Sequence, residues 1–440
     1  MVNARKYAGK KQLNRSLEIF AKFVNSVGGN LLQVRRESLY NDEPKLFAYS
    51  AFYKTKSKKS EIEASGISFK KQRALVRVLG EAVERYCLDN FDERKLLLRK
   101  VSDMQRPYLN PTEVISLSKQ QLSKKSFQKF IIKCESEFRW IEGSALSSGR
   151  KVFVPAQLVF TSYEKLNREP WIRYPISTGA AAGISLENAI YTGVCEIVER
   201  DAFMISYLNK LKSPIIDLGS IKDREIDHII RLYNRYKLEL IVFDITTDIK
   251  IPSFAAITLD RTGLGPAVSI GLKAGFDIKE VIIGAIEESL MVRAWLRDKF
   301  IYNASSYKKS QTIITVEDRA YFWFKPESIS HLDFWLKGNN VKKVKLNSTL
   351  SDKHNNLNYA VEILKNAGME VIYVDITQPK MKRYGFMVIK VIIPQLQPLY
   401  LDEEYPYFGG RRLYEVPIKL GLHTSPLRED QFNKIPHPFL

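Results

Sequence analysis

The stretch from Ser177 to Leu208 constrains the fold of this chain most, because it joins a loop of small residues to one long apolar segment. Glycine and alanine at positions 179–183 allow the backbone to approach another segment closely, and Ser185 is placed to cap a helix. Apolar residues then recur at helical spacing. We therefore expect a tight loop followed by a long helix with large apolar flanks.

Polar residues form a single stripe along this predicted helix. They are spaced by four, four and three positions: Asn188, Thr192, Glu196 and Glu199. Two ionised carboxylates one turn apart between apolar flanks repel each other and lose hydration, so they need a cation. Mg²⁺ is the usual partner of such oxygen ligands. The stripe therefore predicts a magnesium site.

The sequence pattern ExVER occurs twice, at Glu81–Arg85 and at Glu196–Arg200, 115 residues apart. Each copy lies on a predicted helix with a strong apolar face. A simpler interpretation is that both copies form i,i+4 surface ion pairs, which stabilise a helix by about 0.2–0.5 kcal/mol. Repetition favours metal binding by Glu81, Glu84, Glu196 and Glu199. In the first copy Arg77, four residues before Glu81, competes as an ion-pair partner.

Composition indicates a globular protein of the cytosol. The chain has 440 residues, of which 45% are hydrophobic, enough for a large core. Its three cysteines lack metal-ligand spacing, and its N-terminus lacks a signal-peptide pattern. The longest apolar runs, such as Phe386 to Pro394, are short and interrupted. We expect a cytoplasmic location and no membrane association.

The net charge of +19 is unevenly distributed. Residues 1–60 hold 13 Lys and Arg against 4 Asp and Glu, and so carry +9 of the total. Such a basic segment attracts anions, but no zinc finger, helix-turn-helix or RNA-binding signature accompanies it. We expect an acidic peptide or protein partner, or nucleotide phosphates, rather than nucleic acid.

Helical and strand patterns alternate along much of the chain, which indicates a mixed fold. Residues 300–345 are aromatic and irregular, and we interpret them as a peripheral insertion. The predicted helices are residues 13–27, 70–88, 118–133, 223–236, 278–297 and 359–368. The predicted strands are residues 138–141, 151–154, 239–244, 253–259, 267–271, 369–377 and 384–393.

Several common catalytic motifs are missing. The sequence contains no GxxxxGK[ST] loop, no GxGxxG after a strand, no HExxH and no GxSxG elbow. Its five histidines are scattered, which argues against a histidine-based triad or a zinc site. A nucleotide enzyme with this sequence would hold phosphate through metals bound to glutamates.

The motifs together resemble the YcaO family of ATP-dependent enzymes, which modify backbone amides of ribosomal peptides. The resemblance runs from about Ser65 to Leu440. It rests on GEAVERY at 80–86, STGAAAG followed by EIVERDAF at 196–203, AIEESLMVR at 285–293, GRRLYEVPIKLGL at 410–422 and the PHPFL ending. It implies an α+β fold, with mixed β-sheets and long helices surrounding an ATP cleft, over residues 61–440, preceded by a basic segment at 1–60.

The resemblance also implies roles for single residues. By position, the magnesium ligands are Glu81, Glu84, Glu196 and Glu199. The nucleotide contacts are Ser177, Asn188, Arg200, Glu288 and Arg293. Ile184, Asn188 and Met291 depart from the residues that the family often carries at these positions, which affects the adenosine and ribose contacts.

The proline-bearing C-terminus resembles that of azoline-forming members. Pro436 and Pro438 stiffen the tail, which could hold the carboxylate of Leu440 at a definite point as a general base, whereas the simpler interpretation is a frayed end. In cyclodehydration a Cys, Ser or Thr side chain of the peptide adds to the preceding amide carbonyl, and ATP phosphorylates the oxygen so that it leaves as phosphate.

The resemblance therefore predicts a cyclodehydratase of the D-protein type, which makes thiazole- and oxazole-modified peptides such as microcins and other bacteriocins. Its predicted partners are a ribosomal precursor peptide, a separate E1-like leader-binding protein and, where azoles are made, an FMN-dependent dehydrogenase, in an oligomer or multi-enzyme complex. A thioamide-forming relative that uses external sulfide is the nearest alternative. A non-catalytic scaffold or nucleic-acid-binding protein is the second.

Overall fold

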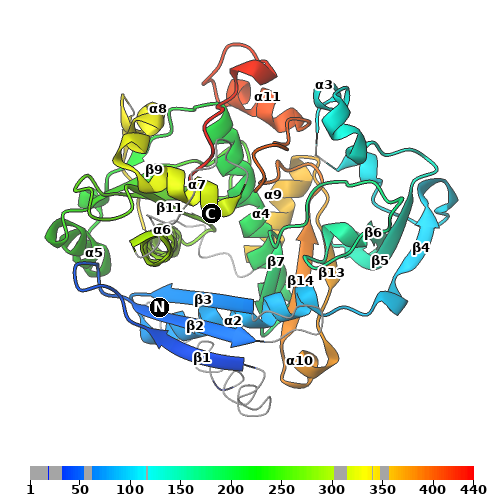
Figure 1. Ribbon diagram of the computed structural model, residues 1–440, viewed down its shortest axis with the longest axis horizontal. Coiled ribbons are helices and arrows are strands. Elements are labelled where there is room, and N and C mark those ends of the chain that lie inside the picture. Colours follow the sequence, from blue (N-terminus) through cyan, green and yellow to red (C-terminus); the bar gives the residue numbers. More distant parts are fainter. Residues whose placement is uncertain are drawn as a thin grey trace. The chain divides into compact units, whose positions relative to one another are not determined.

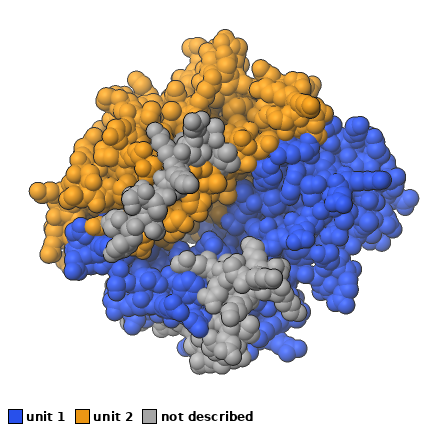
Figure 2. All heavy atoms as spheres, viewed as in Figure 1, with its two compact units in different colours: residues 1–114, 129–194, 370–393 blue, residues 115–128, 195–369, 394–440 orange. Residues whose placement is uncertain are grey.

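The computed structural model describes residues 18, 32–53, 62–114, 117–301, 315–338, 340–346 and 356–440. The chain divides into two compact units (Figure 2). Unit 1 comprises residues 1–114, 129–194 and 370–393, and unit 2 comprises residues 115–128, 195–369 and 394–440. The helix predicted at 13–27 lies outside the described residues, apart from Glu18.

Unit 1 contains a three-stranded antiparallel sheet covered by one long helix. The strands are β1 (Leu32–Glu37), β2 (Phe47–Tyr53) and β3 (Ile62–Ser68), and helix α2 (Lys71–Asp89) packs against β2 and β3 (Figure 1). Gly66 permits this close packing, since a Cβ atom there would lie 2.4 Å from the backbone nitrogen of Val78. The helix that carries the first ExVER is therefore fixed against the sheet.

A second sheet of unit 1 has six strands. Its order is β4-β5-β13-β14-β7, with β6 paired to β5, and its pairs are antiparallel. Helix α2 packs also on β7 and β14. The strands are β4 (Leu97–Lys100), β5 (Glu137–Ala145), β6 (Lys151–Pro155), β7 (Ala180–Gly183), β13 (Ile372–Asp375) and β14 (Met387–Ile392).

Unit 2 is built on a five-stranded sheet of order β11-β10-β9-β8-β12, in which β12 pairs parallel with β8. Helix α6 (Ile278–Ile301) packs against β10 and β11. Gly271 allows this contact, because a Cβ atom there would lie 2.2 Å from the carbonyl oxygen of Ala285. The strands are β8 (Ile215–Ile216), β9 (Glu239–Asp244), β10 (Ser253–Leu259), β11 (Val268–Ala274) and β12 (Val341–Lys342).

Aromatic side chains fill much of the interior of unit 2. Trp323 and Trp335 are 1% and 0% exposed, so the stretch between 315 and 338 contributes to the core.

The other α-helices of the described residues, in both units, are α3 (Lys119–Leu122), α4 (Leu186–Leu208), α5 (Arg224–Arg235), α7 (Val316–Phe324), α8 (Asp333–Leu336), α9 (Asn356–Asn366), α10 (Pro379–Arg383) and α11 (Arg411–Lys419). The 3₁₀ helices found in the same described ranges are Glu93–Lys95, Val101–Asp103, Pro111–Glu113, Lys125–Phe130, Ala156–Leu158, Leu218–Ser220, Pro326–Leu332 and Glu429–Gln431.

The α+β fold class is confirmed, and the predicted long helices and strands are present with small shifts at their ends. The continuous helix predicted at 118–133 is wrong. A capping box at Ser118 starts α3, which ends at Leu122 and is followed by a 3₁₀ turn. The buried side chain of Gln121 donates to the carbonyl of Pro406, so a tertiary contact holds this short segment rather than a helical apolar stripe.

Candidate active site

The second ExVER helix forms the centre of a charged group in unit 2. Arg200 lies between three carboxylates: it pairs with Glu199, and its Nη2 atom lies 3.7 Å from Glu196 Oε1 and 4.0 Å from Glu288 Oε1. We call these four residues the acid–arginine cluster. Glu199 and Arg200 are buried, at 2% and 8% exposure. The cluster therefore brings together four of the residues that the sequence analysis assigned to metal and nucleotide.

Strand β11 anchors two of these carboxylates through its backbone. The amide of Ala274 donates to Glu199 Oε2 at 3.1 Å, and the amide of Leu272 donates to Glu288 Oε2 at 2.6 Å. Because α4 carries Glu199 and α6 carries Glu288, the strand holds acids from both helices at one place. Hydrogen bonds from amides to ionised carboxylates are stronger than those between neutral groups, which fixes the two side chains.

Arg293, a predicted nucleotide contact, lies on the same helix as Glu288 but has other partners. Its guanidinium donates to Asp260 Oδ2 and to the carbonyl of Pro266, both at 2.8 Å. Burial alone would raise the pKa of Asp260, but hydrogen bonds from Thr262 and Arg293 outweigh burial and hold that pKa below its usual value. Arg293 is 3% exposed, so in this structure it braces the loop between β10 and β11.

The acid–arginine cluster suits a divalent cation by its chemistry. It has three carboxylates around one guanidinium, and carboxylate oxygen is the ligand that Mg²⁺ prefers. Arg200 occupies the space between the acids, and its buried Nε atom has no hydrogen-bond partner. Among the described residues, no group of three His, Cys, Asp or Glu side chains is arranged to hold a metal ion. A bound cation would need the carboxylates of the cluster, and a bound phosphate would need the guanidinium of Arg200.

The first ExVER helix is described within unit 1. Glu81 accepts a hydrogen bond from the amide of Ser65 at 3.0 Å and pairs with Arg85 at 2.5 Å. Glu84, one turn further, is partly buried. The i,i+4 ion pair of the simpler interpretation is therefore present in this copy, although its acid is also tied to β3. Arg77, the predicted competitor, donates to the carbonyl of Ile67 at 2.7 Å.

Two further predicted nucleotide contacts lie in unit 1. Ser177 is exposed and precedes β7. Asn188 is exposed in the first turn of α4, where the amide of Asn188 bonds to Ser185 Oγ at 3.3 Å. This bond confirms Ser185 as the capping residue. The side chains of Ser177 and Asn188 are thus available to a ligand.

The C-terminal tail is docked in unit 2. The carbonyl of Pro436 accepts hydrogen bonds from Tyr207 at 3.0 Å and from Trp323 at 2.9 Å. Pro438 is buried, and the ring of Phe439 lies over the guanidinium of Arg200, 4.1 Å from its central carbon. The simpler interpretation of a frayed end is therefore wrong for these residues. The penultimate residue of the chain contacts the acid–arginine cluster directly.

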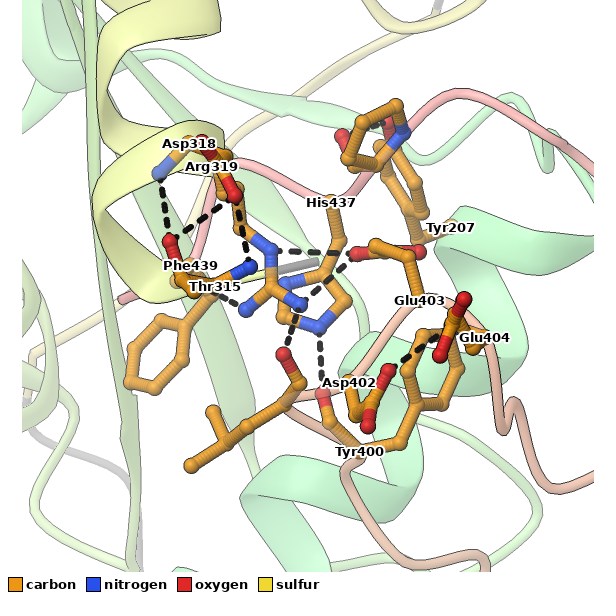
Figure 3. Close-up of polar contacts among 12 residues, drawn as sticks. Tyr207, Thr315, Asp318, Arg319, Tyr400, Asp402, Glu403, Glu404, His437 and Phe439 are labelled. Atoms are coloured by element: carbon orange, nitrogen blue, oxygen red, sulfur yellow. Dashed lines mark hydrogen bonds and ion pairs between the residues drawn. The ribbon is translucent and has the colours of Figure 1, made fainter. Parts of the chain in front are cut away.

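A buried charge pair holds the tail in place (Figure 3). Arg319 on α7 is fully buried and donates two hydrogen bonds to Glu403 Oε1, at 2.7 and 3.0 Å. It donates also to the carbonyls of Leu401 and Phe439, at 2.8 and 3.3 Å. The side chain of Leu440 packs against the apolar group of α6 and α7, made of Val292, Leu296, Phe300 and Ala320.

His437 contributes a second buried anchor. It bonds through Nε2 to the carbonyl of Tyr400 at 2.8 Å and is fully buried. Burial, and then the positive charge of Arg319, hold the pKa of His437 well below its ordinary value, so the ring is neutral at pH 7. Burial raises the pKa of Glu403 despite the opposing charge of Arg319.

The charged residues that hold the tail and the neighbouring segments in place were not predicted from the sequence. Arg319 and Glu403 are 84 residues apart, and Asp201 pairs with Arg412 over 211 residues, at 2.7 Å. Arg412 also pairs with Asp248 at 2.8 Å. Arg412 belongs to the GRRLYEVPIKLGL motif, and Asp201 directly follows the second ExVER. Their positions in these motifs are the sequence signal that could have indicated both residues.

Two solved structures show how widely this fold is shared with known proteins. One is a heterocyclase in complex with substrate and cofactor, at TM-score 0.78 and 22% identity, with 97% of this chain and 57% of that chain covered. The other is YcaO from Methanopyrus kandleri bound with AMPPCP and Mg²⁺, at TM-score 0.63 and 16% identity, with 90% and 93% covered. The chain thus spans little more than half of the heterocyclase. These likenesses establish the fold.

The family is established by sequence. The family profile described as YcaO cyclodehydratase, ATP- and Mg²⁺-binding, matches residues 65–397. An uncharacterised protein from Methanothermobacter thermautotrophicus is 25% identical over 290 residues, covering 63% of this chain and 70% of that protein. The chain belongs to the YcaO cyclodehydratase family, whose members are ATP-dependent enzymes that bind ATP and Mg²⁺. None of the helices in the described part of the chain is long and apolar enough to cross a membrane.

Proposed function

We propose that this protein is an ATP- and Mg²⁺-dependent cyclodehydratase that converts Cys, Ser or Thr residues of a ribosomal precursor peptide into thiazolines or oxazolines. One observation carries the proposal: in unit 2 the docked C-terminal tail places Phe439 on Arg200, at the centre of three carboxylates. The cluster carboxylates proposed to bind metal and the tail that carries the proposed general base thus lie next to each other in unit 2.

The proposal assigns Mg²⁺ to Glu81, Glu84, Glu196 and Glu199. It assigns the nucleotide to Ser177, Asn188, Arg200, Glu288 and Arg293. The chemistry of the acid–arginine cluster supports the assignments of its own four residues, since three acids exceed the charge of one arginine. The M. kandleri YcaO structure bound with AMPPCP and Mg²⁺ supports, by analogy, a nucleotide and Mg²⁺ as the ligands. Arg200, released from Glu196 and Glu199, would pair with phosphate.

The reaction needs a leaving group, because an amide oxygen departs poorly as hydroxide. Bound MgATP supplies it, by transfer of a phosphoryl group to that oxygen. The side chain of the substrate gives up its proton as it adds to the preceding carbonyl. The phosphorylated oxygen then leaves as phosphate, while the amide nitrogen gives up its proton and the C=N bond forms. We assign proton removal to the carboxylate of Leu440, and its positioning to Pro436 and Pro438. The hydrogen bonds that Tyr207 and Trp323 donate to the carbonyl of Pro436 support this assignment, because they hold the tail at a defined place.

The proposal includes a separate leader-binding protein of the E1-like type, and an FMN-dependent dehydrogenase where azoles are formed, in a multi-enzyme complex of the cytoplasm. By analogy, the structure of the E. coli microcin synthetase complex with pro-MccB17 bound, which contains a similar chain at TM-score 0.58 and 15% identity, supports partner proteins and a peptide substrate. The products would belong to the thiazole/oxazole-modified microcins and other bacteriocins.

Mass spectrometry of a co-expressed precursor peptide tests the reaction. Loss of one water for each modified Cys, Ser or Thr supports cyclodehydration. Exchange of oxygen for sulfur contradicts it and indicates the thioamide-forming alternative. Absence of any Mg²⁺-dependent ATP turnover by the chain with its partner and peptide contradicts an enzymatic role altogether.

Two substitutions test the site. Glu196→Gln and Glu199→Gln should each abolish ATP turnover, since a neutral amide cannot balance the charge of the metal. Glu239→Gln is the matched control, because Glu239 forms an exposed ion pair with Arg261 in the same unit. Full turnover by both cluster variants would refute the metal assignment. Circular dichroism of all three variants checks that the fold is retained.

A further inference from the structure

Unit 2 contains a cavity that the proposed reaction does not use. It has a volume of about 470 Å³, within the roughly 300–1,000 Å³ range of ligand pockets. Its lining comes from the second half of α4 and residues 211–214 after it, the turn between β9 and β10, the start of α6, β12 with its flanking residues, and the chain after α11. No residue of the acid–arginine cluster lines it.

The inner wall of the cavity is apolar. Ala202, Ile245 and Phe254 lie there with exposures of 0%, 4% and 2%. Leu422, which follows α11, also lines the cavity and is 46% exposed, one of the few large apolar side chains of the described residues that face water. A group that covered Leu422 and filled the inner wall would gain apolar burial.

Several polar side chains of the wall already have partners. Ser206 and Ser213 bond to each other at 3.0 Å, and Ser206 also accepts from Trp335 at 3.1 Å. Asp244, the only carboxylate of the lining, pairs with Lys342 at 2.5 Å. These groups leave no demand for an additional donor or a cation at this site.

Two positive charges at the cavity are not compensated. Lys212 and Lys250 line it and are exposed. Within the described ranges, neither ammonium group has a hydrogen-bond or ion-pair partner. With Lys342 neutralised by Asp244, the cavity presents an apolar wall beside two free cations. The complementary ligand carries a carboxylate next to an apolar side chain.

We propose that this cavity binds an acidic and apolar segment of the precursor peptide, outside the residues that are modified. The inference rests on the proposed function for the identity of the peptide. Ala202 and Ser206 lie on α4 one to two turns beyond Glu199, a rise of roughly 5–10 Å along the helix axis. The cavity and the acid–arginine cluster therefore lie along the same helix.

A defined peptide tests the cavity without any catalysis. The probe is fluorescein-labelled Glu-Leu-Glu-Phe-Glu with blocked ends, and its partner probe replaces each Glu with Gln. Fluorescence anisotropy measures binding to the whole chain without ATP or Mg²⁺. We expect the acidic probe to bind the wild type at least tenfold more tightly than the Gln probe does. Equal affinity for the two probes, or no binding of the acidic probe, overturns the proposal.

Two variants locate the binding. Lys212→Glu with Lys250→Glu should weaken the acidic probe at least tenfold, and Leu422→Ser at least threefold. The matched control, Lys124→Glu with Lys222→Glu, makes the same charge change at exposed lysines of unit 2 outside the cavity and should change affinity less than twofold. An equal loss in the control shows attraction by net charge alone and overturns the proposal, as does unchanged affinity in the cavity variants.

Turnover of the precursor peptide separates this inference from the proposed function. The double variant of Lys212 and Lys250 should raise KM for the peptide while kcat stays within twofold of the wild type. Lysine-dependent probe binding by a chain without cyclodehydratase activity would refute the function and retain the cavity. Full activity with unchanged KM in the double variant would refute the cavity and retain the function.

Discussion

Removal of Arg319 is the sharpest test of how the tail is held. Arg319→Met keeps the length of the side chain but deletes a fully buried guanidinium. It leaves Glu403, 16% exposed in its side chain, without its cation, and it leaves the carbonyls of Leu401 and Phe439 without a donor. Breaking a buried ion pair from one side costs about 3–5 kcal/mol. We expect a loss of that size in the free energy of unfolding of unit 2.

A second substitution isolates the charge. The double variant Arg319→Met with Glu403→Gln leaves no unpaired carboxylate at position 403. Only the lost hydrogen bonds, about 1 kcal/mol each, should then lower the free energy of unfolding. The double variant should therefore be more stable than Arg319→Met alone, although it carries one more substitution. A double-mutant cycle gives the coupling energy between the two side chains.

Urea unfolding at pH 7, followed by tryptophan fluorescence, measures these changes, because Trp323 and Trp335 are buried in the same unit. Lys337→Met is the control: Lys337 pairs with Asp333 at the surface, and its loss should leave the midpoint nearly unchanged. A cost below about 1 kcal/mol for Arg319→Met, or simple additivity in the cycle, would show that this pair does not hold the tail.

Three other predictions concern the tail and the core of unit 2. The pKa of His437 is depressed in the folded chain, so the unfolded chain binds more protons once the pH falls below 6.5. The free energy of unfolding should therefore decrease as the pH falls below 6.5, by up to about 1.4 kcal/mol per pH unit. His437→Gln should lack this decrease when urea midpoints are compared at pH 7.5 and pH 5.5. Gly271→Ala places a Cβ atom 2.2–2.3 Å from backbone atoms of α6 and should lower the free energy of unfolding by about 1–3 kcal/mol or more. Gly284→Ala meets only the flexible side chain of Lys273 and should be near neutral. Thermal unfolding of the two variants distinguishes these outcomes. Deletion of Leu440 should lower kcat for cyclisation about 10²–10⁴-fold with little change in the affinity for ATP, and an unchanged kcat would exclude its carboxylate as the base.

Much of the fold was predictable because local patterns are strong in this chain. Helices α2, α4 and α6 carry long apolar faces, and strands β9 to β11 are mostly apolar. Both kinds of pattern depend on neighbours within a few residues, which the sequence shows directly. The segment at 118–133 was predicted wrongly, since its short helix is held by a contact with Pro406, far along the chain, which local patterns do not show.

The candidate site was predictable only in part. The repeated ExVER identified its acids, but the pattern does not tell a metal ligand from a partner of arginine. In this structure Glu199 is both a partner of Arg200 and an acceptor from β11. The assignment of Arg293 to nucleotide stays a prediction, since it braces Asp260 here.

The sequence by itself determined which residue types stand one turn apart on each helix, and that residues 434–440 carry two prolines. Those features are local and follow from covalent order and helical period. Tertiary structure decided which charges meet. Arg200 lies under Phe439, and Arg319 joins Glu403 to the tail, because folding brings together segments between 84 and 239 residues apart. Burial then makes each of those pairings costly to break, and no local pattern specifies them.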